Sequence, residues 1–237
     1  CMPKEKFEKD HCFLSHTEVL SFEEIIRLGK IFAANGVEKI RLTGGEPLLR
    51  KGIEFLITEL SKLKTWNDKP LDVAVTTNGA ALSAKAKSLA AAGLKRLTVS
   101  LDAMDPQIYK DLNDVNFPIE KTLAGIQAAK DAGIPSIKIN VVVKRGVNEK
   151  ELIKIAEHFK GTGIIVRYIE FMDVGTSNGW RLDDVVPSRQ IVEEINRVYP
   201  IEPLNPNYTS EVATRWGYKD GSGELGFISS VSEPFCK

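Results

Sequence analysis

The chain has 237 residues, and its 32 lysines and arginines are balanced by 32 aspartates and glutamates, so its formal net charge at pH 7 is zero. This balance gives no support for nucleic acid or an anionic membrane as a partner, and any basic site must therefore be local. The sequence contains no long apolar run and no signal peptide, from which we expect a soluble, cytoplasmic protein large enough to bury a sizeable core.

The predicted elements alternate between helices and strands along most of the chain. A first helix begins at the capping box Ser21-Phe22-Glu23-Glu24 and closes at Asn35-Gly36. Five strands are predicted, at 39–43, 71–77, 95–101, 136–143 and 164–171. Helical patterns separate them, at 53–60, 83–92, 119–132 and 148–160, with a short helix opened by Asp105-Pro106. This fivefold rhythm predicts a parallel sheet with helices outside it.

The alternation of helices and strands ends near Pro200. Residues 212–218 and 225–231 flank a Lys-Asp-Gly-Ser-Gly-Glu stretch, which predicts an antiparallel hairpin. We therefore expect an α/β body at 1–200 and a β-hairpin extension at 201–237.

The strand at 39–43 runs directly into the turn Gly44-Gly45-Glu46-Pro47. Two glycines allow a tight turn in which backbone amides and carbonyls can approach a ligand. The alternative is an ordinary connection between a strand and a helix, because paired glycines after strands are common.

Several predicted strands keep a polar residue at every second position, whereas strands buried on both faces are nearly continuous in Val, Ile and Leu. The polar positions are Lys39, Arg41, Thr43, Asp72, Thr76, Thr98, Ser100, Asp102, Ser136, Lys138 and Asn140. Basic residues among hydroxyls favour an anionic ligand, because an unpaired buried charge is costly. A polar interior also indicates a sheet too open to close into a compact barrel. The alternative is an antiparallel sheet with one solvated face, which the interleaved helices oppose.

The three cysteines, Cys1, Cys12 and Cys236, are odd in number and far apart, which argues against a disulfide framework. The chain begins with Cys1 rather than Met and stops one residue after Cys236. We interpret it as a segment of a longer protein.

Taken together, these residues resemble a known family. Cys1-Met2-Pro3 resembles the end of the C-x-x-x-C-x-x-C motif of radical S-adenosylmethionine (SAM) enzymes, and Gly44-Gly45-Glu46-Pro47 resembles their methionine-binding turn. More narrowly, the chain resembles the molybdenum cofactor biosynthesis protein A family, the GTP 3',8-cyclases. The stretches that carry this narrower resemblance are 40–50, Thr76-Thr77-Asn78-Gly79, Val99-Ser100-Leu101-Asp102, Lys138-Ile139-Asn140, Ile169-Glu170-Phe171-Met172 and Phe235-Cys236.

The resemblance implies a partial (β/α)6 barrel, similar to a TIM barrel, whose first strand lies before residue 1. It implies an enzyme, a radical SAM lyase, with two [4Fe-4S] clusters. Cys1 would be a ligand of the first cluster and Cys236 of the second, and soft thiolates suit such clusters. The other cluster ligands and the family's C-terminal arginine motif are absent from this sequence, so we expect the 237 residues alone to be inactive.

The resemblance also implies which residues bind the small molecules. It assigns SAM to Gly44, Gly45, Glu46, Ser100 and Met172, and GTP to Arg41, Thr76 and Lys138, with Lys39 and Arg167 as further candidates for the phosphates. It implies no catalytic residue beyond the cofactor ligands. Because the GTP residues fall on the polar positions, we expect them to converge on one hollow with Gly45 and Ser100 at its rim. Arg167 stays open, with a helix-facing surface charge as the alternative.

The implied reaction converts GTP to (8S)-3',8-cyclo-7,8-dihydroguanosine 5'-triphosphate, the first step of molybdenum cofactor biosynthesis, and needs an external one-electron donor. A homodimer and a downstream enzyme of the molybdopterin pathway are further implications, while nucleic acid and membrane are not expected as partners. Two alternatives are open: another radical SAM enzyme, such as a peptide-modifying maturase, and a non-catalytic nucleotide-binding α/β module.

Overall fold

The computed structural model describes residue 14 and residues 18–113, 117–172, 180–208 and 211–233. The chain divides into two compact units. The first comprises Cys1–Thr98 and Lys121–Ser136, and the second comprises Val99–Glu120 and Ile137–Lys237. The division falls inside one strand, β3 (Arg96–Ser100), between Thr98 and Val99.

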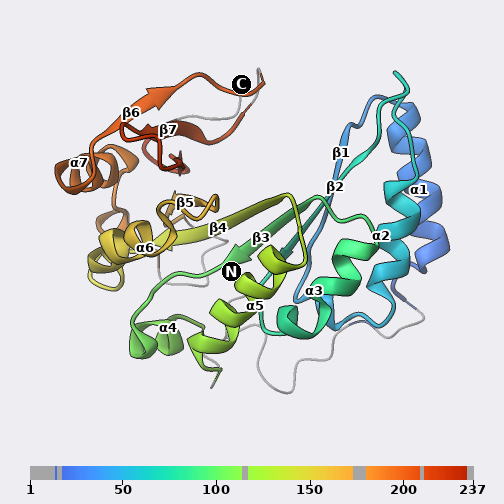
Figure 1. The fold of residues 1–237 in the computed structure, drawn as a ribbon, viewed down its shortest axis with the longest axis horizontal. Helices are drawn as coiled ribbons and strands as arrows, with labels where there is room; N and C mark the ends of the chain where they lie inside the picture. The colour runs from blue at the N-terminus through green and yellow to red at the C-terminus, as the bar shows by residue number, and fades with distance from the viewer. Residues whose placement is uncertain (1–13, 15–17, 114–116, 173–179, 209–210, 234–237) are drawn as a thin grey trace. The chain divides into compact units, whose positions relative to one another are not determined.

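The first unit is a parallel sheet flanked by helices. Its elements are α1 (Phe22–Ala34), β1 (Lys39–Leu42), a 3-10 helix at Pro47–Leu49, α2 (Ile53–Ser61), β2 (Asp72–Thr77), α3 (Leu82–Ala91), the first part of β3 (Arg96–Ser100) and most of α5 (Ile119–Asp131). The strand order is β1-β2-β3, and β1 pairs in parallel with β2. Figure 1 shows α1 and α2 side by side along the same face of β1 and β2.

Helix α1 begins at the predicted capping box. Ser21 Oγ accepts a hydrogen bond from the backbone N–H of Glu24 at 3.2 Å, and Glu24 Oε2 accepts one from Ser21 N at 2.8 Å. Two amides at the helix start are therefore satisfied without the preceding turn. The core beneath the helices is closed to solvent, since Ile57 and Leu60 of α2 and Val75 of β2 are all 0% exposed.

In the second unit, parallel strands are followed along the chain by antiparallel ones. Its elements are α4 (Pro106–Asn113), β4 (Ser136–Val143), a 3-10 helix at Glu149–Glu151, α6 (Leu152–Phe159), β5 (Ile165–Glu170), a 3-10 helix at Leu182–Asp184, α7 (Ser188–Val198), β6 (Ile201–Leu204), β7 (Thr214–Tyr218) and β8 (Glu224–Ile228). The strand order from β4 is β4-β5-β8-β7-β6. The fold is thus the predicted mixed α/β type, with a parallel core and antiparallel strands at the C-terminal end.

Strand β4 confirms the predicted alternation of polar and apolar residues. Ile137 and Ile139 are buried, whereas Lys138 and Asn140 are half-buried. The register of the parallel strands β4 and β5 places Arg167 opposite Asn140. Since paired residues of neighbouring strands point to the same face, Arg167 belongs to the polar face, and the helix-facing alternative for it is wrong.

The C-terminal hairpin is present as predicted, but it is joined to the sheet in a way that the sequence did not predict. Strands β7 and β8 pair antiparallel, and β8 also pairs in parallel with β5. Tyr168 of β5 and Phe227 of β8 are both 0% exposed, and their rings stack with centroids 5.8 Å apart. The hairpin therefore shares the core of the second unit.

Helix α7 and strand β6 were not predicted. The helix follows Pro187 and buries Ile191 and Ile195, a spacing of four residues that fits one helical face. Figure 1 shows α6 and α7 packed beside each other, and both contact β5. In the part of the chain that the structure describes, no helix is both long enough and apolar enough to cross a bilayer.

Candidate functional site

The Gly-Gly-Glu-Pro turn is held by the side chain of its glutamate. Glu46 Oε1 accepts hydrogen bonds from Thr77 Oγ1 at 2.7 Å and from Leu48 N at 3.0 Å, and Oε2 accepts one from Asn78 N at 2.7 Å. One carboxylate therefore ties the turn after β1 to the turn after β2. The two motifs that the sequence analysis singled out separately are one structural unit.

The glycines of the turn leave its backbone open. Gly44 has a φ of 150°, a conformation that residues with a Cβ rarely adopt. A Cβ built on Gly44 or Gly45 would meet no atom of the described chain within 4 Å. The turn thus fits the predicted role of a cradle whose peptide groups a ligand can approach.

Helix α5 packs against the turn that follows β2, a contact that was not predicted from the sequence. A Cβ on Gly125 would lie only 3.0 Å from the carbonyl oxygen of Gly79 and 3.0 Å from Leu82 Cβ. Thr122 of the same helix, which is 0% exposed, donates to the carbonyl of Asn78 at 3.5 Å. The helix can approach the turn this closely only because residue 125 has no side chain.

Arg41 joins three strands of the first unit. Its Nη1 donates to Thr76 Oγ1 at 2.7 Å and to Thr98 Oγ1 at 3.2 Å. The structure therefore brings together Arg41 and Thr76, two of the three residues predicted to bind GTP. Thr98 was placed on the polar face by the sequence but was given no role there. The two threonines orient the guanidinium, whose planar fork suits phosphate oxygens.

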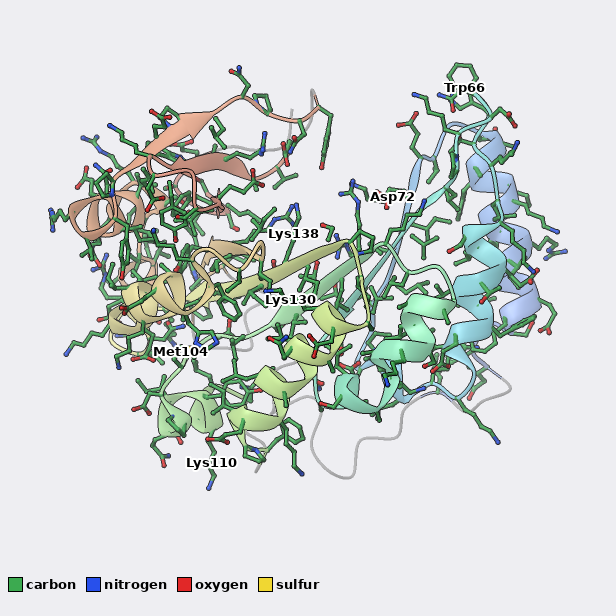
Figure 2. All side chains as sticks on the ribbon, viewed as in Figure 1. Trp66, Asp72, Met104, Lys110, Lys130 and Lys138 are labelled. Atoms are coloured by element: carbon green, nitrogen blue, oxygen red, sulfur yellow. The ribbon has the colours of Figure 1, made fainter. Side chains whose placement is uncertain are left out.

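Lys39 lies two residues before Arg41 but has a different environment. Asp72, directly opposite it in the register, lies 3.9 Å from the Lys39 ammonium and 2.8 Å from Nε of Arg96. Figure 2 labels Asp72 in the first unit. One carboxylate thus balances two cations at this position, so the positive charge of Lys39 is partly offset.

The second unit presents its own basic face. Lys138 and Asn140 lie on β4, with Arg167 opposite Asn140, and Lys138 is labelled in Figure 2. A Cβ on Gly226, the β8 partner of Arg167, would lie 3.1 Å from Arg167 Cγ. The stem of Arg167 therefore lies close against this position, and a larger residue there would have to push it aside by a few tenths of an ångström. Asn140 Oδ1 is buried and accepts no hydrogen bond from the described residues, so it is a polar group suited to a ligand.

The Val-Ser-Leu-Asp segment at the end of β3, residues 99–102, is held in place by Asp102. Its Oδ1 accepts a hydrogen bond from Val142 N at 2.7 Å, and the side-chain amide of Asn148 donates to the carbonyls of Asp102 and Val142. Burial raises the pKa of Asp102 to about 6, because the single amide hydrogen bond only partly offsets the loss of hydration. This bracing fixes the backbone two residues beyond Ser100.

Met172 is 43% exposed and lies two residues beyond the end of β5. The neighbouring carbonyl of Phe171 accepts a hydrogen bond from Trp180 Nε1 at 3.0 Å. The Lys144 ammonium lies 4.7 Å from the centre of the Phe171 ring and 3.4 Å from Asp184. These contacts fix the backbone before Met172 and leave its thioether accessible.

Cys1 and Cys236, the predicted cluster ligands, lie outside the described residues. Within the described ranges, no group of three or more His, Cys, Asp or Glu residues could hold a metal ion. The remaining predicted residues divide between the units: Arg41, Thr76, Gly44, Gly45 and Glu46 belong to the first, and Ser100, Lys138, Arg167 and Met172 to the second. Their convergence on one hollow stays a prediction.

Comparison with known proteins relates each part of the chain to a family. Residues 1–159 match the Radical SAM superfamily, and residues 164–237 match Molybdenum Cofactor Synthesis C. The chain is 47% identical over 237 residues to a GTP 3',8-cyclase of Acidothermus cellulolyticus, covering all of this chain and 64% of that protein. It is 48% identical over 236 residues to a GTP 3',8-cyclase of Xanthomonas campestris pv. campestris, covering 68% of that protein. The chain thus spans about two thirds of the length of these relatives.

Solved structures with a similar fold are more distant in sequence. The crystal structure of Streptococcus suis SuiB matches with a TM-score of 0.60 at 19% identity, covering 78% of this chain and 42% of SuiB. SuiB bound to S-adenosylmethionine matches with a TM-score of 0.60 at 18% identity, covering 78% of this chain and 43% of that one. At these identities the likeness concerns the fold alone.

Proposed function

Because the chain belongs to the radical SAM superfamily and, within it, to the family of the GTP 3',8-cyclases, we propose that its protein converts GTP to (8S)-3',8-cyclo-7,8-dihydroguanosine 5'-triphosphate. This reaction is the first step of molybdenum cofactor biosynthesis, and the enzyme would be a lyase. The observation that carries the proposal is the contact between Arg41 and Thr76. Two residues from different strands, both implied to bind GTP, meet on a polar sheet face.

A [4Fe-4S] cluster with bound SAM would supply the one-electron chemistry that removes a hydrogen atom from C3' of GTP, after which C3' bonds to C8 of the guanine. The residues of this chain would bind, orient and shield the reactants. For SAM, the open peptide groups of Gly44 and Gly45 would meet its amino end, and Glu46 would hold that turn in place. Ser100 and Met172 would also bind SAM.

For GTP, Arg41 would bind the triphosphate with its guanidinium oriented by Thr76 and Thr98. Lys138 and Arg167 would add positive charge from β4 and β5. Lys39 would contribute less, because Asp72 offsets its charge.

The proposal includes two [4Fe-4S] clusters, with Cys1 a ligand of the first and Cys236 a ligand of the second. One thiolate does not hold such a cluster, so both depend on cysteines beyond these 237 residues, and the isolated segment would be inactive. An external one-electron donor would reduce the first cluster. We further propose a cytoplasmic location, a homodimer, and a later enzyme of the same pathway that takes the cyclised nucleotide.

The test is anaerobic incubation of the full-length protein with GTP, SAM and a reductant, followed by analysis of the nucleotides. We expect a cyclised guanine nucleotide together with 5'-deoxyadenosine. Cleavage of SAM without a cyclised nucleotide would favour another radical SAM enzyme, such as a peptide-modifying maturase. Absence of iron–sulfur absorbance would favour a non-catalytic nucleotide-binding module.

The matched variants Arg41→Ala and Arg96→Ala separate a specific phosphate site from general positive charge. The two arginines lie on β1 and β3, the strands on either side of β2 in the first unit, but Arg96 is bound to Asp72. We expect Arg41→Ala to weaken GTP binding by about 10- to 100-fold, the worth of a charge-assisted hydrogen-bond pair, and Arg96→Ala to have little effect. Equal losses in the two variants would contradict the assignment of Arg41.

A further inference from the structure

Asn140 begins a row of polar-face residues that crosses the strands of the second unit. The register of β4 and β5 pairs Asn140 with Arg167, and that of β5 and β8 pairs Arg167 with Gly226. Lys138 precedes Asn140 by two residues on β4, so both side chains point to the same face of that strand. The amide of Asn140 therefore has one cation beside it on its own strand and another on the neighbouring strand.

The oxygen of this amide has no hydrogen-bond donor in the part of the chain that the structure describes. Asn140 Oδ1 is closed to solvent and accepts no hydrogen bond from any described residue. The residue as a whole is half-buried, so the amide does not belong to the sealed core. A buried polar atom without a partner is unfavourable, and packing within the fold gives no reason for it.

The nearest candidate donor, Arg167, leans away from Asn140. A Cβ built on Gly226 would lie 3.9 Å from Arg167 Cβ and only 3.1 Å from Arg167 Cγ. Because the distance shortens along the side chain, Arg167 leans toward β8, which lies on the side of β5 opposite to β4. Gly226 has no side chain that would prevent this. The amide of Asn140 thus keeps its oxygen unpaired although a guanidinium occupies the next register position.

The two cations indicate which molecule meets this amide. Lys138 and Arg167 favour an anionic ligand, and the proposed function supplies one in the triphosphate of GTP. Ionised phosphate oxygens accept hydrogen bonds but donate none, so a phosphate cannot satisfy Asn140 Oδ1. SAM fits this position less well, because its sulfonium would place a third positive charge beside two cations.

The ribose is the part of the nucleotide that offers the missing donor. It joins the phosphates to the base, so its hydroxyls are the first hydrogen-bond donors that a nucleotide presents beyond its phosphates. The guanine edge also carries N–H donors, but it lies farther from the phosphates than the sugar does. A residue next to phosphate-binding cations therefore meets the sugar before the base.

We propose that Asn140 is a specificity-determining residue for the nucleotide, and that its side-chain oxygen accepts a hydrogen bond from a ribose hydroxyl of GTP. This role rests on the proposed function, because it takes GTP as the ligand of the polar face. Asn140 would then recognise the sugar, while Lys138 and Arg167 bind the phosphates.

The test compares the affinities of the full-length protein for GTP, 2'-deoxy-GTP and 3'-deoxy-GTP, as wild type and as Asn140→Leu. We expect wild type to bind GTP about tenfold more tightly than one of the two deoxy analogues, the difference made by one hydrogen bond. The analogue that binds more weakly identifies the hydroxyl. In Asn140→Leu this preference should fall to about twofold or less. An unchanged preference in the variant, or a wild type that distinguishes GTP from neither analogue, would overturn the proposal.

Failure of the proposed function gives a different result. Wild-type protein that forms no cyclised nucleotide from GTP, SAM and a reductant would refute the proposed function itself. If the cyclised nucleotide forms but Asn140→Leu keeps the wild-type nucleotide preference, only the role of Asn140 is refuted. A variant that loses affinity for SAM while keeping that preference would show that the amide serves SAM instead, which also overturns the proposal.

Ser136→Ala is the matched control. Ser136 lies on the same face of β4, on the other side of Lys138, and is also half-buried. We expect this variant to keep the wild-type preference among the three nucleotides. Equal losses of preference in the two variants would reflect a general disturbance of β4 and would overturn the role of Asn140.

Stability measurements separate binding from folding. Because Asn140 Oδ1 has no partner among the described residues, Asn140→Leu should resist thermal unfolding at least as well as wild type when no nucleotide is present. Asn140→Asp keeps an acceptor oxygen at the same position, so it should keep the preference for the hydroxyl even if leucine disturbs the strand. A folded Asn140→Asp variant without that preference would contradict the proposal.

Discussion

Each unit has a carboxylate at a strand end that joins two chain segments by hydrogen bonds, and the two carboxylates differ in how deeply they are buried. Glu46 follows β1, is half-buried, and joins two turns of the first unit through three hydrogen bonds. Glu170 ends β5, is fully buried, and joins the start of α7 to residues 231–232 through four. The carboxylate of Glu46 is itself reached by water, whereas that of Glu170 is closed to it.

From this difference in burial we expect Glu46 to affect mainly ligand binding and Glu170 mainly the stability of the fold. Replacing the half-buried Glu46 should cost the fold little stability. The loss should instead appear as a lower affinity of the turn for its ligand. A fully buried carboxylate such as Glu170 is part of the fold itself, because without its donors it would be an unpaired charge in the interior.

The largest effect is expected from Glu170→Ala. Removing the carboxylate leaves three backbone N–H groups and a hydroxyl without their acceptor, which should destabilise the full-length protein by about 3–5 kcal/mol. Glu46→Ala should cost less, about 1–2 kcal/mol, since the carboxylate is half-buried and its donor Asn78 is exposed to water. Urea unfolding of the two variants measures the difference. Similar losses of unfolding free energy would show that burial does not distinguish the two carboxylates.

Asp102 sharpens the comparison, because it is also buried at a strand end but has a single amide donor. Its raised pKa of about 6 means that folding favours the protonated form, so its contribution to stability is present below about pH 4 and is lost as the pH rises through 6. Glu170 has the opposite sign: its pKa is lowered, and its contribution is lost as the pH falls below the ordinary value. The number of hydrogen-bond donors around a buried carboxylate thus decides whether its pKa is raised or lowered.

Asp102→Asn removes this titration while keeping an oxygen that can accept from Val142 N. We expect the variant to be more stable than wild type by about 2–3 kcal/mol at pH 7, with the difference disappearing near pH 4. Unfolding free energies measured from pH 4 to pH 7 provide the test. A difference that does not change with pH would mean that Asp102 is ionised at little cost in the folded protein.

The fold could be predicted from the sequence where the information is local. The alternation along β4 placed Lys138 on the polar face correctly, and the capping box placed the start of α1 correctly. The parallel pairing of β8 with β5 was not predicted, since it joins strands far apart in the chain and no local pattern records which edge a hairpin will meet. Helix α7 was missed although Ile191 and Ile195 carried a helical spacing.

The same distinction between local and distant information holds for the residues of the candidate site. Arg41 and Glu46 were found because alternation and a glycine turn mark them in the sequence. Glu170 was missed because its partners are backbone amides of distant segments. An acidic residue on the same strand face as Val166 and Tyr168 was nevertheless an exception to the apolar pattern that the sequence shows. Gly125 was missed because a glycine inside a helix looks like a weak position until the facing turn is known.

Glu46→Gln tests the binding side of the comparison. Glutamine replaces one carboxylate oxygen of Glu46 with an amide NH2 group, which cannot accept the hydrogen bond that Thr77 or Asn78 now donates. The turn after β1 should therefore be held less firmly to Asn78. We expect SAM binding to the reconstituted full-length protein to weaken about tenfold, equivalent to about 1.4 kcal/mol, with GTP binding unchanged. The control is Glu54→Gln, in which a half-buried carboxylate bound to Lys85 is altered away from both turns. A loss of SAM affinity in both variants would contradict a specific role for Glu46.

The smallest effect is expected from two glycines that differ in what they face. Alanine at Gly125 would bring its Cβ to 3.0 Å from the Gly79 carbonyl, a backbone atom of the turn that Glu46 holds. Alanine at Gly29 would come closer, to 2.8 Å, but to the end of the flexible Leu60 side chain. Both changes gain helix propensity, so we expect Gly125→Ala to destabilise by about 1 kcal/mol and Gly29→Ala to be nearly neutral. Thermal unfolding measures the two costs, and a larger cost at Gly29 would mean that distance alone, and not the rigidity of the neighbour, governs the packing of these helices.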